Sequence, residues 1–136
     1  MTKPIKFKNL FVYGTLKEKG ALHNHWLKDQ TFMGTYYTEP NYFMFNYGHF
    51  PIVFPVKKGT GQIIEGEIFE VDKDAFSNVS AMEEGAGYEV QQDVFLSKGG
   101  AIHRMASIYV YPAKFLKFDG EIKKGVVSWN NGAMSL

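Results

Sequence analysis

The segment Phe11-Val12-Tyr13-Gly14-Thr15-Leu16 decides the fold, because it joins a short apolar run to a glycine. Residues 10–13 predict a fully buried strand, since the run is short, apolar and bounded by a turn residue. Gly14 tolerates tight backbone conformations and lets another group approach the main chain closely. We interpret the segment as a buried strand that ends in a ligand-binding turn. Taken alone, such a segment is more often an ordinary strand–turn junction, so the ligand role depends on residues elsewhere in the chain.

Most of the remaining chain favours strands. Aromatic residues make up 16% of the sequence, and aromatic and β-branched side chains suit a pleated, half-buried surface. We expect a short helix at 21–28 and a second helix that Asp72 or Asp74 caps, which runs through Met82 and is broken by the run from Glu83 to Tyr88. Further strands are expected at 31–37, 42–45, 50–55, 63–71, 88–96 and 101–111, with a weaker signal at 126–129. Without βαβ alternation or internal repeats, this pattern predicts a curved or closed mixed sheet with two helices against it.

Composition narrows the class of protein. The 136 residues fit one domain, 1–136, with a core at about 9–112. A formal net charge of +1 offers no basic surface for nucleic acid, and the apolar runs are far shorter than the ~20 residues that a membrane-spanning helix needs. The absence of cysteine excludes disulfides and a thiol nucleophile, and suits a reducing cytoplasm. We therefore expect a soluble, cytoplasmic protein that binds small molecules or other proteins, with no nucleic-acid or membrane partner; the oligomeric state cannot be read from the sequence.

Several chemically suggestive residues have ordinary structural interpretations. His23 and His25 could share one strand face, but no nearby acid or cysteine completes a metal set, so a surface or capping role is favoured. Thr15 lacks the Ser/His/Asp type of pattern that activates a nucleophile, so we do not expect it to act as one. Gly66-Glu67 predicts a bulge or close backbone approach followed by a surface acid. Glu83-Glu84, without other information, is most simply a solvated acidic turn.

Five segments in order resemble one known family. They are Val12-Tyr13-Gly14-Thr15-Leu16-Lys17 with Asn24-His25 soon after; Tyr42-Phe43-Met44-Phe45-Asn46-Tyr47-Gly48-His49-Phe50-Pro51, which contains a Gly-x-x-Pro; Ile64-Glu65-Gly66-Glu67-Ile68-Phe69-Glu70-Val71-Asp72; Met82-Glu83-Glu84-Gly85 followed by Tyr88; and Ala106-Ser107-Ile108-Tyr109-Val110-Tyr111. A four-residue string recurs by chance, whereas this ordered set covers roughly residues 10–111. The chain thus resembles the γ-glutamylcyclotransferase-like proteins, also called the AIG2-like or BtrG-like family.

The resemblance implies an α+β fold, a small mixed β-barrel with a few short helices. It also implies a pocket between the glycine turn and a glutamate, where γ-glutamyl amides cyclise to 5-oxoproline and a free amine without metal or cofactor. The implied substrate-binding residues are Tyr13, Gly14, Thr15, Leu16 and Tyr88. Glu84 is the expected catalytic residue and Glu83 its rival, because adjacent acids leave the alignment ambiguous; the glycine that follows Glu84 favours Glu84.

The sequence also departs from the family's pattern. Many members have Leu-Asp a few residues before Glu-Gly, where this chain has Ser80-Ala81, and many have an arginine where this chain has Val90. A non-catalytic domain of the same fold that binds a small ligand is therefore the second hypothesis. An interaction protein that presents exposed aromatic side chains is the third.

Overall fold

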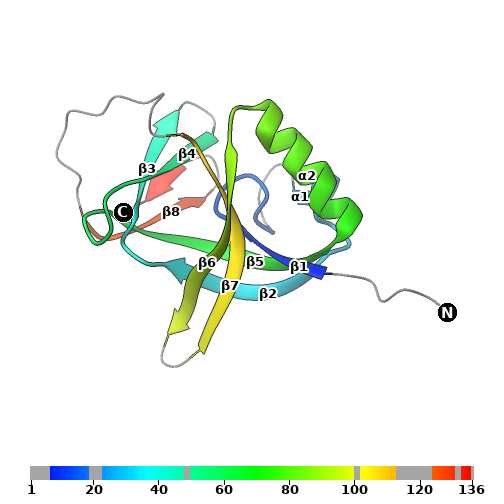
Figure 1. The fold of residues 1–136 in the computed structure, drawn as a ribbon, viewed down its shortest axis with the longest axis horizontal. Helices are drawn as coiled ribbons and strands as arrows, with labels where there is room; N and C mark the ends of the chain where they lie inside the picture. Colours follow the sequence, from blue (N-terminus) through cyan, green and yellow to red (C-terminus); the bar gives the residue numbers. More distant parts are fainter. Residues whose placement is uncertain are drawn as a thin grey trace.

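The computed structural model describes residues 7–18, 23–47, 50–99, 102–112, 124–130 and 133–135, with the side chains of Tyr47 and Phe50 left out. No helix within these ranges is long and apolar enough to cross a lipid bilayer. The described chain forms a barrel with a helical layer on one side and a separate hairpin on another (Figure 1).

Five strands close into the barrel, in the order β1, β7, β6, β2, β5 and back to β1. Only the β1–β7 pair in this ring is parallel, so the barrel is mixed. The strands are β1 (Phe7–Val12), β2 (Thr31–Thr38), β5 (Ile63–Asp72), β6 (Glu89–Gly99) and β7 (Ile102–Val110). The closed mixed barrel with two described helices confirms the expected fold class.

Four further described strands lie outside the five-stranded ring. β3 (Tyr42–Tyr47) and β4 (Phe50–Pro55) form an antiparallel hairpin, which accommodates two prolines in β4 because β4 pairs on only one described side. β8 (Val126–Asn130) runs parallel to β5 and pairs with it through Val126 and Val127. β9 (Ala133–Ser135), which sequence patterns do not predict, pairs with β8.

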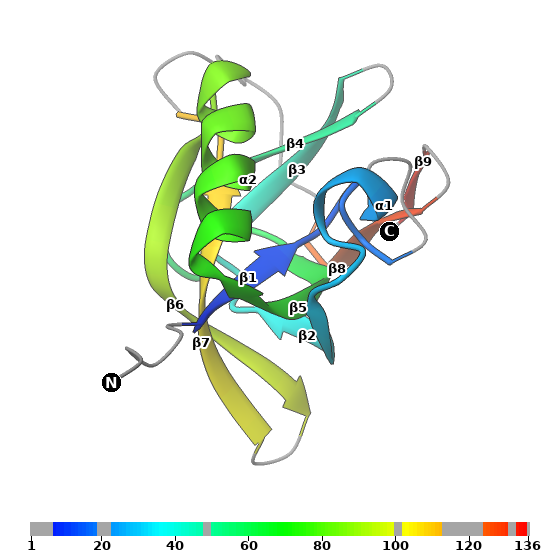
Figure 2. The same ribbon diagram turned by 90° about the vertical axis from the view of Figure 1, so that its right-hand side faces the viewer.

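Both faces of β1 are buried over its last three residues, which explains the continuous apolar run there. Phe11 and Tyr13 point into a cluster that contains side chains from all five barrel strands. Leu10 and Val12 point to the opposite face, into a second cluster that includes Val79 of the helix α2 (Lys73–Gly85). Side chains alternate along a strand, so a strand between two apolar layers needs apolar residues at every position. Figure 2 shows β1 passing beneath α2.

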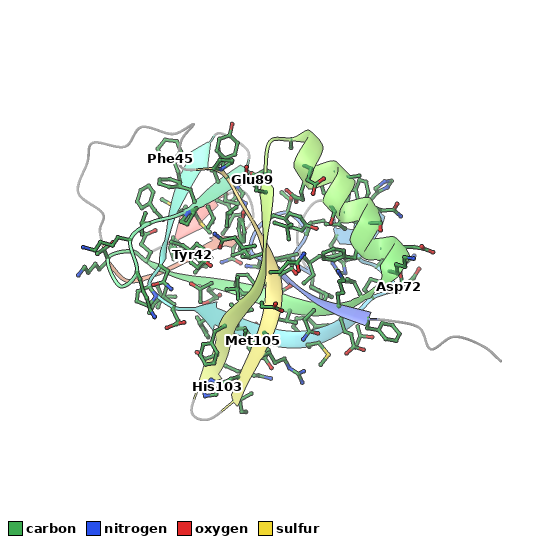
Figure 3. All side chains as sticks on the ribbon, viewed as in Figure 1. Tyr42, Phe45, Asp72, Glu89, His103 and Met105 are labelled. Carbon is green, nitrogen blue, oxygen red and sulfur yellow. The ribbon has the colours of Figure 1, made fainter. Side chains whose placement is uncertain are left out.

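The helix α2 begins where expected and ends within the run expected to break it. Asp72 caps it, since the Asp72 carboxylate accepts a hydrogen bond from the Ala75 N–H at 2.8 Å; Figure 3 shows Asp72 at this end of α2. The helix was expected to run through Met82 and to be broken within the run from Glu83 to Tyr88; it ends at Gly85, inside that run, so Glu83 and Glu84 are still helical. The other described helix, α1 (His23–Trp26), covers four residues of the expected 21–28, and the positions before His23 lie outside the described residues.

Candidate functional site

A cavity opens where β1 ends and its turn passes between α2 and the β3–β4 hairpin. It encloses about 370 Å³, its open mouth included. The cavity brings together parts of the chain that lie far apart in sequence: the end of β1 with its turn, β4, the last turn of α2, and β7. Its lining residues are Phe11, Val12, Tyr13, Gly14, Thr15, Leu16, Pro51, Glu83, Tyr88 and Tyr109.

All five residues expected to bind substrate line this cavity, and four of them lie at the end of β1. The Lys17 N–H donates to the Gly14 carbonyl oxygen at 3.1 Å, which closes a tight turn around Thr15 and Leu16. Neither the Thr15 N–H nor the Leu16 N–H makes a hydrogen bond to another residue that the structure describes. Both donors thus lack a partner among the described residues, and donors of this kind in concave backbone turns bind anions.

Gly14 is required by a close contact with the β3–β4 hairpin. A Cβ atom at this position would lie 2.8 Å from Pro51 Cγ, which is shorter than real Cβ contacts, and 3.1 Å from Pro51 Cδ, which is a tight contact. The close approach is therefore to the opposite wall of the cavity. A larger residue would push the turn and Pro51 apart.

The structure separates the two candidate glutamates. Glu83 lines the cavity, whereas Glu84 is exposed and does not line it. Helical phase explains the difference. At about 100° per residue, Glu83 lies about 40° around the helix from the fully buried Val79, and Glu84 lies about 140° away. The geometry thus favours Glu83, the rival in the sequence-based expectation, over Glu84.

Burial gives the Glu83 carboxyl an unusual acidity. Desolvation raises its pKa from 4.5 to about 7, since a charged carboxylate loses hydration in this setting. Glu83 is also in the last turn of α2, where the negative end of the helix dipole disfavours an anion. A carboxyl with such a pKa exists in both protonation states near neutral pH, which suits a group that takes up and returns a proton.

A helix-terminating motif places Tyr88 beside Glu83. The Tyr88 N–H donates to the Glu83 carbonyl oxygen, and the Gly87 N–H donates to the Glu84 carbonyl oxygen, both at 3.0 Å. These bonds form a Schellman motif, which needs a left-handed residue after the helix. Gly87, with φ of 98°, fills that position. The backbone then reverses so that Tyr88 and Glu83 both reach the cavity, and the Tyr88 hydroxyl donates to the Pro51 carbonyl oxygen at 3.0 Å.

Three tyrosines around Glu83 keep their hydroxyl protons. Burial, together with the nearby Glu83 carboxylate, raises the pKa of Tyr13, Tyr88 and Tyr109. The Tyr13 hydroxyl donates to the Tyr109 carbonyl oxygen at 2.6 Å, and the Tyr109 hydroxyl is in close hydrogen-bond contact with Ser80 on α2. Ser80 thus connects α2 to a wall of the cavity.

Residues outside the expected site also shape it. Pro51 and Tyr109 line the cavity, and Glu67 accepts a hydrogen bond from the Glu18 N–H at 2.6 Å, just after the turn. Glu67, expected to be a surface acid, is partly exposed and also anchors the turn. At Gly66 the close-approach alternative holds, because an added Cβ would lie 2.5 Å from the Val12 carbonyl oxygen.

His23 and His25 have different surroundings. His23 is buried against Phe69, and its Nδ1 lies 3.1 Å from the Leu16 carbonyl oxygen; because a carbonyl only accepts, Nδ1 carries the proton in this contact. The favoured surface or capping role is therefore wrong for His23. His25 is exposed and packs edge-on against Trp26. No group of three His, Asp or Glu side chains among the described residues is arranged to hold a metal ion.

Comparison with known sequences finds one family and two curated relatives with the same description. The family described as gamma-glutamyl cyclotransferase, AIG2-like, matches residues 10–130. Two curated relatives carry the name "Putative gamma-glutamylcyclotransferase". The protein from Drosophila melanogaster is 30% identical over 131 residues, which span 90% of this chain and 80% of the relative. The protein from Pyrococcus horikoshii is 33% identical over 85 residues, which span 62% of this chain and 67% of the relative.

Solved structures share the fold. A crystal structure of the uncharacterised Pyrococcus horikoshii protein has a TM-score of 0.56 and 30% sequence identity, and the match covers 76% of this chain and 77% of the other. An AIG2-like protein from Mus musculus has a TM-score of 0.63 at 21% identity, with 76% of each chain covered. The match to the family extends from β1 through β8 and includes every residue that lines the cavity. This chain belongs to the gamma-glutamyl cyclotransferase, AIG2-like family.

Proposed function

We propose that the protein is a γ-glutamyl-amine cyclotransferase, which releases 5-oxoproline and a free amine. The observation that carries this proposal is the position of Glu83, a half-buried carboxyl with a raised pKa, in the same cavity as the unpaired N–H groups of Thr15 and Leu16. Membership of the family supports the same reaction class.

In this reaction the substrate supplies its own nucleophile. The α-amino nitrogen attacks the γ-carbonyl carbon, a C–N bond forms to close a five-membered lactam, and the bond from the γ-carbon to the leaving amine breaks. At neutral pH the α-amine is protonated and the glutamyl chain is flexible. The enzyme must therefore remove one proton, hold the chain curled, and stabilise the oxyanion; holding reacting groups in register contributes up to about 7–11 kcal/mol.

We assign the proton transfers to Glu83 rather than to Glu84. The ionised Glu83 takes a proton from the substrate ammonium, and the protonated Glu83 returns a proton to the departing amine. A positioned acid or base of this kind accelerates a reaction by about 10²–10⁴-fold. The raised pKa supports both steps, because neither protonation state is strongly favoured near pH 7.

The turn after β1 is assigned to the anionic parts of the substrate. The Thr15 and Leu16 N–H groups bind the α-carboxylate or the developing oxyanion. Tyr13, Gly14 and Tyr88 complete the walls around the glutamyl chain. We further propose that the reaction uses no cofactor and takes place in the cytoplasm. The cysteine-free composition suits that reducing compartment.

The test measures 5-oxoproline release from γ-glutamyl amino acids, γ-glutamyl-ε-lysine and glutathione. We expect the wild type to release 5-oxoproline from at least one substrate, Glu83→Gln to lose at least 100-fold in kcat (roughly the low end for a general base), and the matched control Glu84→Gln to retain activity. Equal background release by wild type and Glu83→Gln from every substrate would refute the proposed activity; thermal stabilisation by glutamyl-like anions would then favour a domain that binds a small ligand without catalysis.

A further inference from the structure

Lys17, the last residue of the cavity turn, is buried although its side chain carries a charge. Its exposed fraction is 8%, and lysine is seldom buried to this degree unless its ammonium group is paired. The Lys17 ammonium donates to the Trp129 carbonyl oxygen at 2.9 Å and to Asn130 Oδ1 at 2.6 Å. Both acceptors belong to β8, more than 100 positions later in the sequence, and both are uncharged.

Such a contact is an expensive way to stabilise a fold. A buried ammonium gives up its hydration, and two neutral acceptors return only part of that free energy. A methionine has a similar length and would fill the same space without a charge to desolvate. The presence of Lys17 is therefore better explained by what its ammonium group holds in place than by packing.

The ammonium group ties the turn to the barrel wall. The Lys17 backbone N–H closes the turn on Gly14, so the side chain and the turn move together. β8 is itself paired with β5 at Ile63 and Ile64. On the other side of Lys17, the Glu18 N–H donates to the Glu67 carboxylate of β5. Two polar ties thus hold the end of the turn, and both lead back to β5.

We propose that Lys17 is a positioning residue for substrate binding: its tie to Trp129 and Asn130 on β8 holds the Thr15 and Leu16 N–H groups where they meet the substrate's α-carboxylate. Lys17 does not line the cavity, so it acts through the turn and does not touch the substrate. The proposal rests on the proposed function, and it assigns to the turn the carboxylate, one of the two anionic groups considered above.

The kinetic test compares Lys17→Met, Lys17→Arg and Asn130→Ala with the exposed-lysine control Lys57→Met. Because a carboxylate is bound equally before and during the reaction, we expect Lys17→Met to raise KM about tenfold while kcat changes less than about threefold. Asn130→Ala removes one of the two acceptors from an exposed position and is expected to raise KM about threefold without unfolding the protein. Lys17→Arg keeps a cation and is expected to recover most of the loss. A loss confined to kcat would overturn the assignment.

A second measurement is independent of turnover. Amide hydrogen exchange without substrate monitors the turn through the amide of residue 17, whose hydrogen bond to the Gly14 carbonyl oxygen closes it. We expect this amide to exchange about tenfold faster in Lys17→Met than in the wild type, with the amides of Leu10 and Phe11 in β1 unchanged. Absent 5-oxoproline release by the wild type would defeat the proposed function, and the exchange data would still decide the role of Lys17. Exchange at the amide of residue 17 that matches Lys57→Met in both Lys17→Met and Asn130→Ala would overturn the role of Lys17.

Discussion

Replacing Glu83 with glutamine is expected to stabilise the protein at alkaline pH. The Glu83 carboxyl has a pKa of about 7 in the folded state, against 4.5 for an unperturbed group, because burial disfavours its charge. The folded state therefore binds more protons than the unfolded state between these two values. Stability is then fully present below about pH 4.5 and falls as pH rises through about 7. Glutamine resembles the protonated acid in shape and never ionises, so its contribution does not change with pH.

The size of the effect follows from the shift. One pKa unit corresponds to 1.36 kcal/mol, so a change from 4.5 to about 7 corresponds to about 3 kcal/mol in the free energy of unfolding. Because Glu83 keeps some contact with solvent, this figure is an upper bound. At pH 8 we expect Glu83→Gln to be more stable than the wild type by about 2–3 kcal/mol, and at pH 4 the two proteins should be nearly equal.

Urea unfolding at pH 4, 6 and 8 measures this difference, with Glu84→Gln as the matched control. Glu84 is exposed one residue later on the same helix, so its substitution should leave the pH dependence of stability close to that of the wild type. A difference between Glu83→Gln and the wild type that stays constant from pH 4 to pH 8 would show that burial does not perturb Glu83. The same pH dependence in Glu84→Gln would refute the assignment of the two glutamates.

Three further outcomes are expected. For the wild type, kcat/KM should rise with pH with an apparent pKa near 7, because only ionised Glu83 accepts a proton. An apparent pKa near 4.5 would contradict this. Gly87→Ala should cost at least about 1 kcal/mol in urea unfolding and reduce 5-oxoproline release, because φ is 98° and an added Cβ would lie 3.3 Å from the Tyr111 ring. Asp72→Ala should also cost about 1 kcal/mol but leave kcat/KM unchanged, because the cap lies at the end of α2 opposite Glu83; a lower kcat/KM would count against that separation.

Local patterns in the sequence predict most of the strands and both described helices. A strand needs only a few neighbouring residues that fit a pleated sheet, and the cap of α2 uses an oxygen three residues from its donor. Barrel closure is different, because it depends on β1 pairing with β5 and β7. The paired residues of these strands lie about 60 and about 100 positions after β1 in the sequence. The residue pattern predicts a curved or a closed sheet without deciding between them, and the family resemblance supplies the expectation of a barrel.

The same distinction applies to the cavity. The turn after β1 is visible in the sequence because Gly14 interrupts an apolar run. Tyr109, Pro51 and Lys17 reach or support the cavity only through pairings across the fold, so no local pattern assigns them to it. The buried Lys17 is especially hard to predict, since an isolated lysine in a polar stretch is normally exposed.

The choice between Glu83 and Glu84 can be made from local sequence, but two local signals disagree. A single glycine favours Glu84, whereas the helical periodicity favours Glu83. The glycine after Glu84 suggests that the helix has ended, and in a turn either acid can face a pocket. Continuing the helical phase from Phe76 and Val79 by one turn instead places Glu83 on the buried face. Gly87 then marks the true end, because a Schellman motif requires its left-handed residue after the last helical turn. The motif that ends the helix also brings Tyr88 back to Glu83, so Gly87 determines where α2 stops, while the helical phase determines which glutamate lines the cavity.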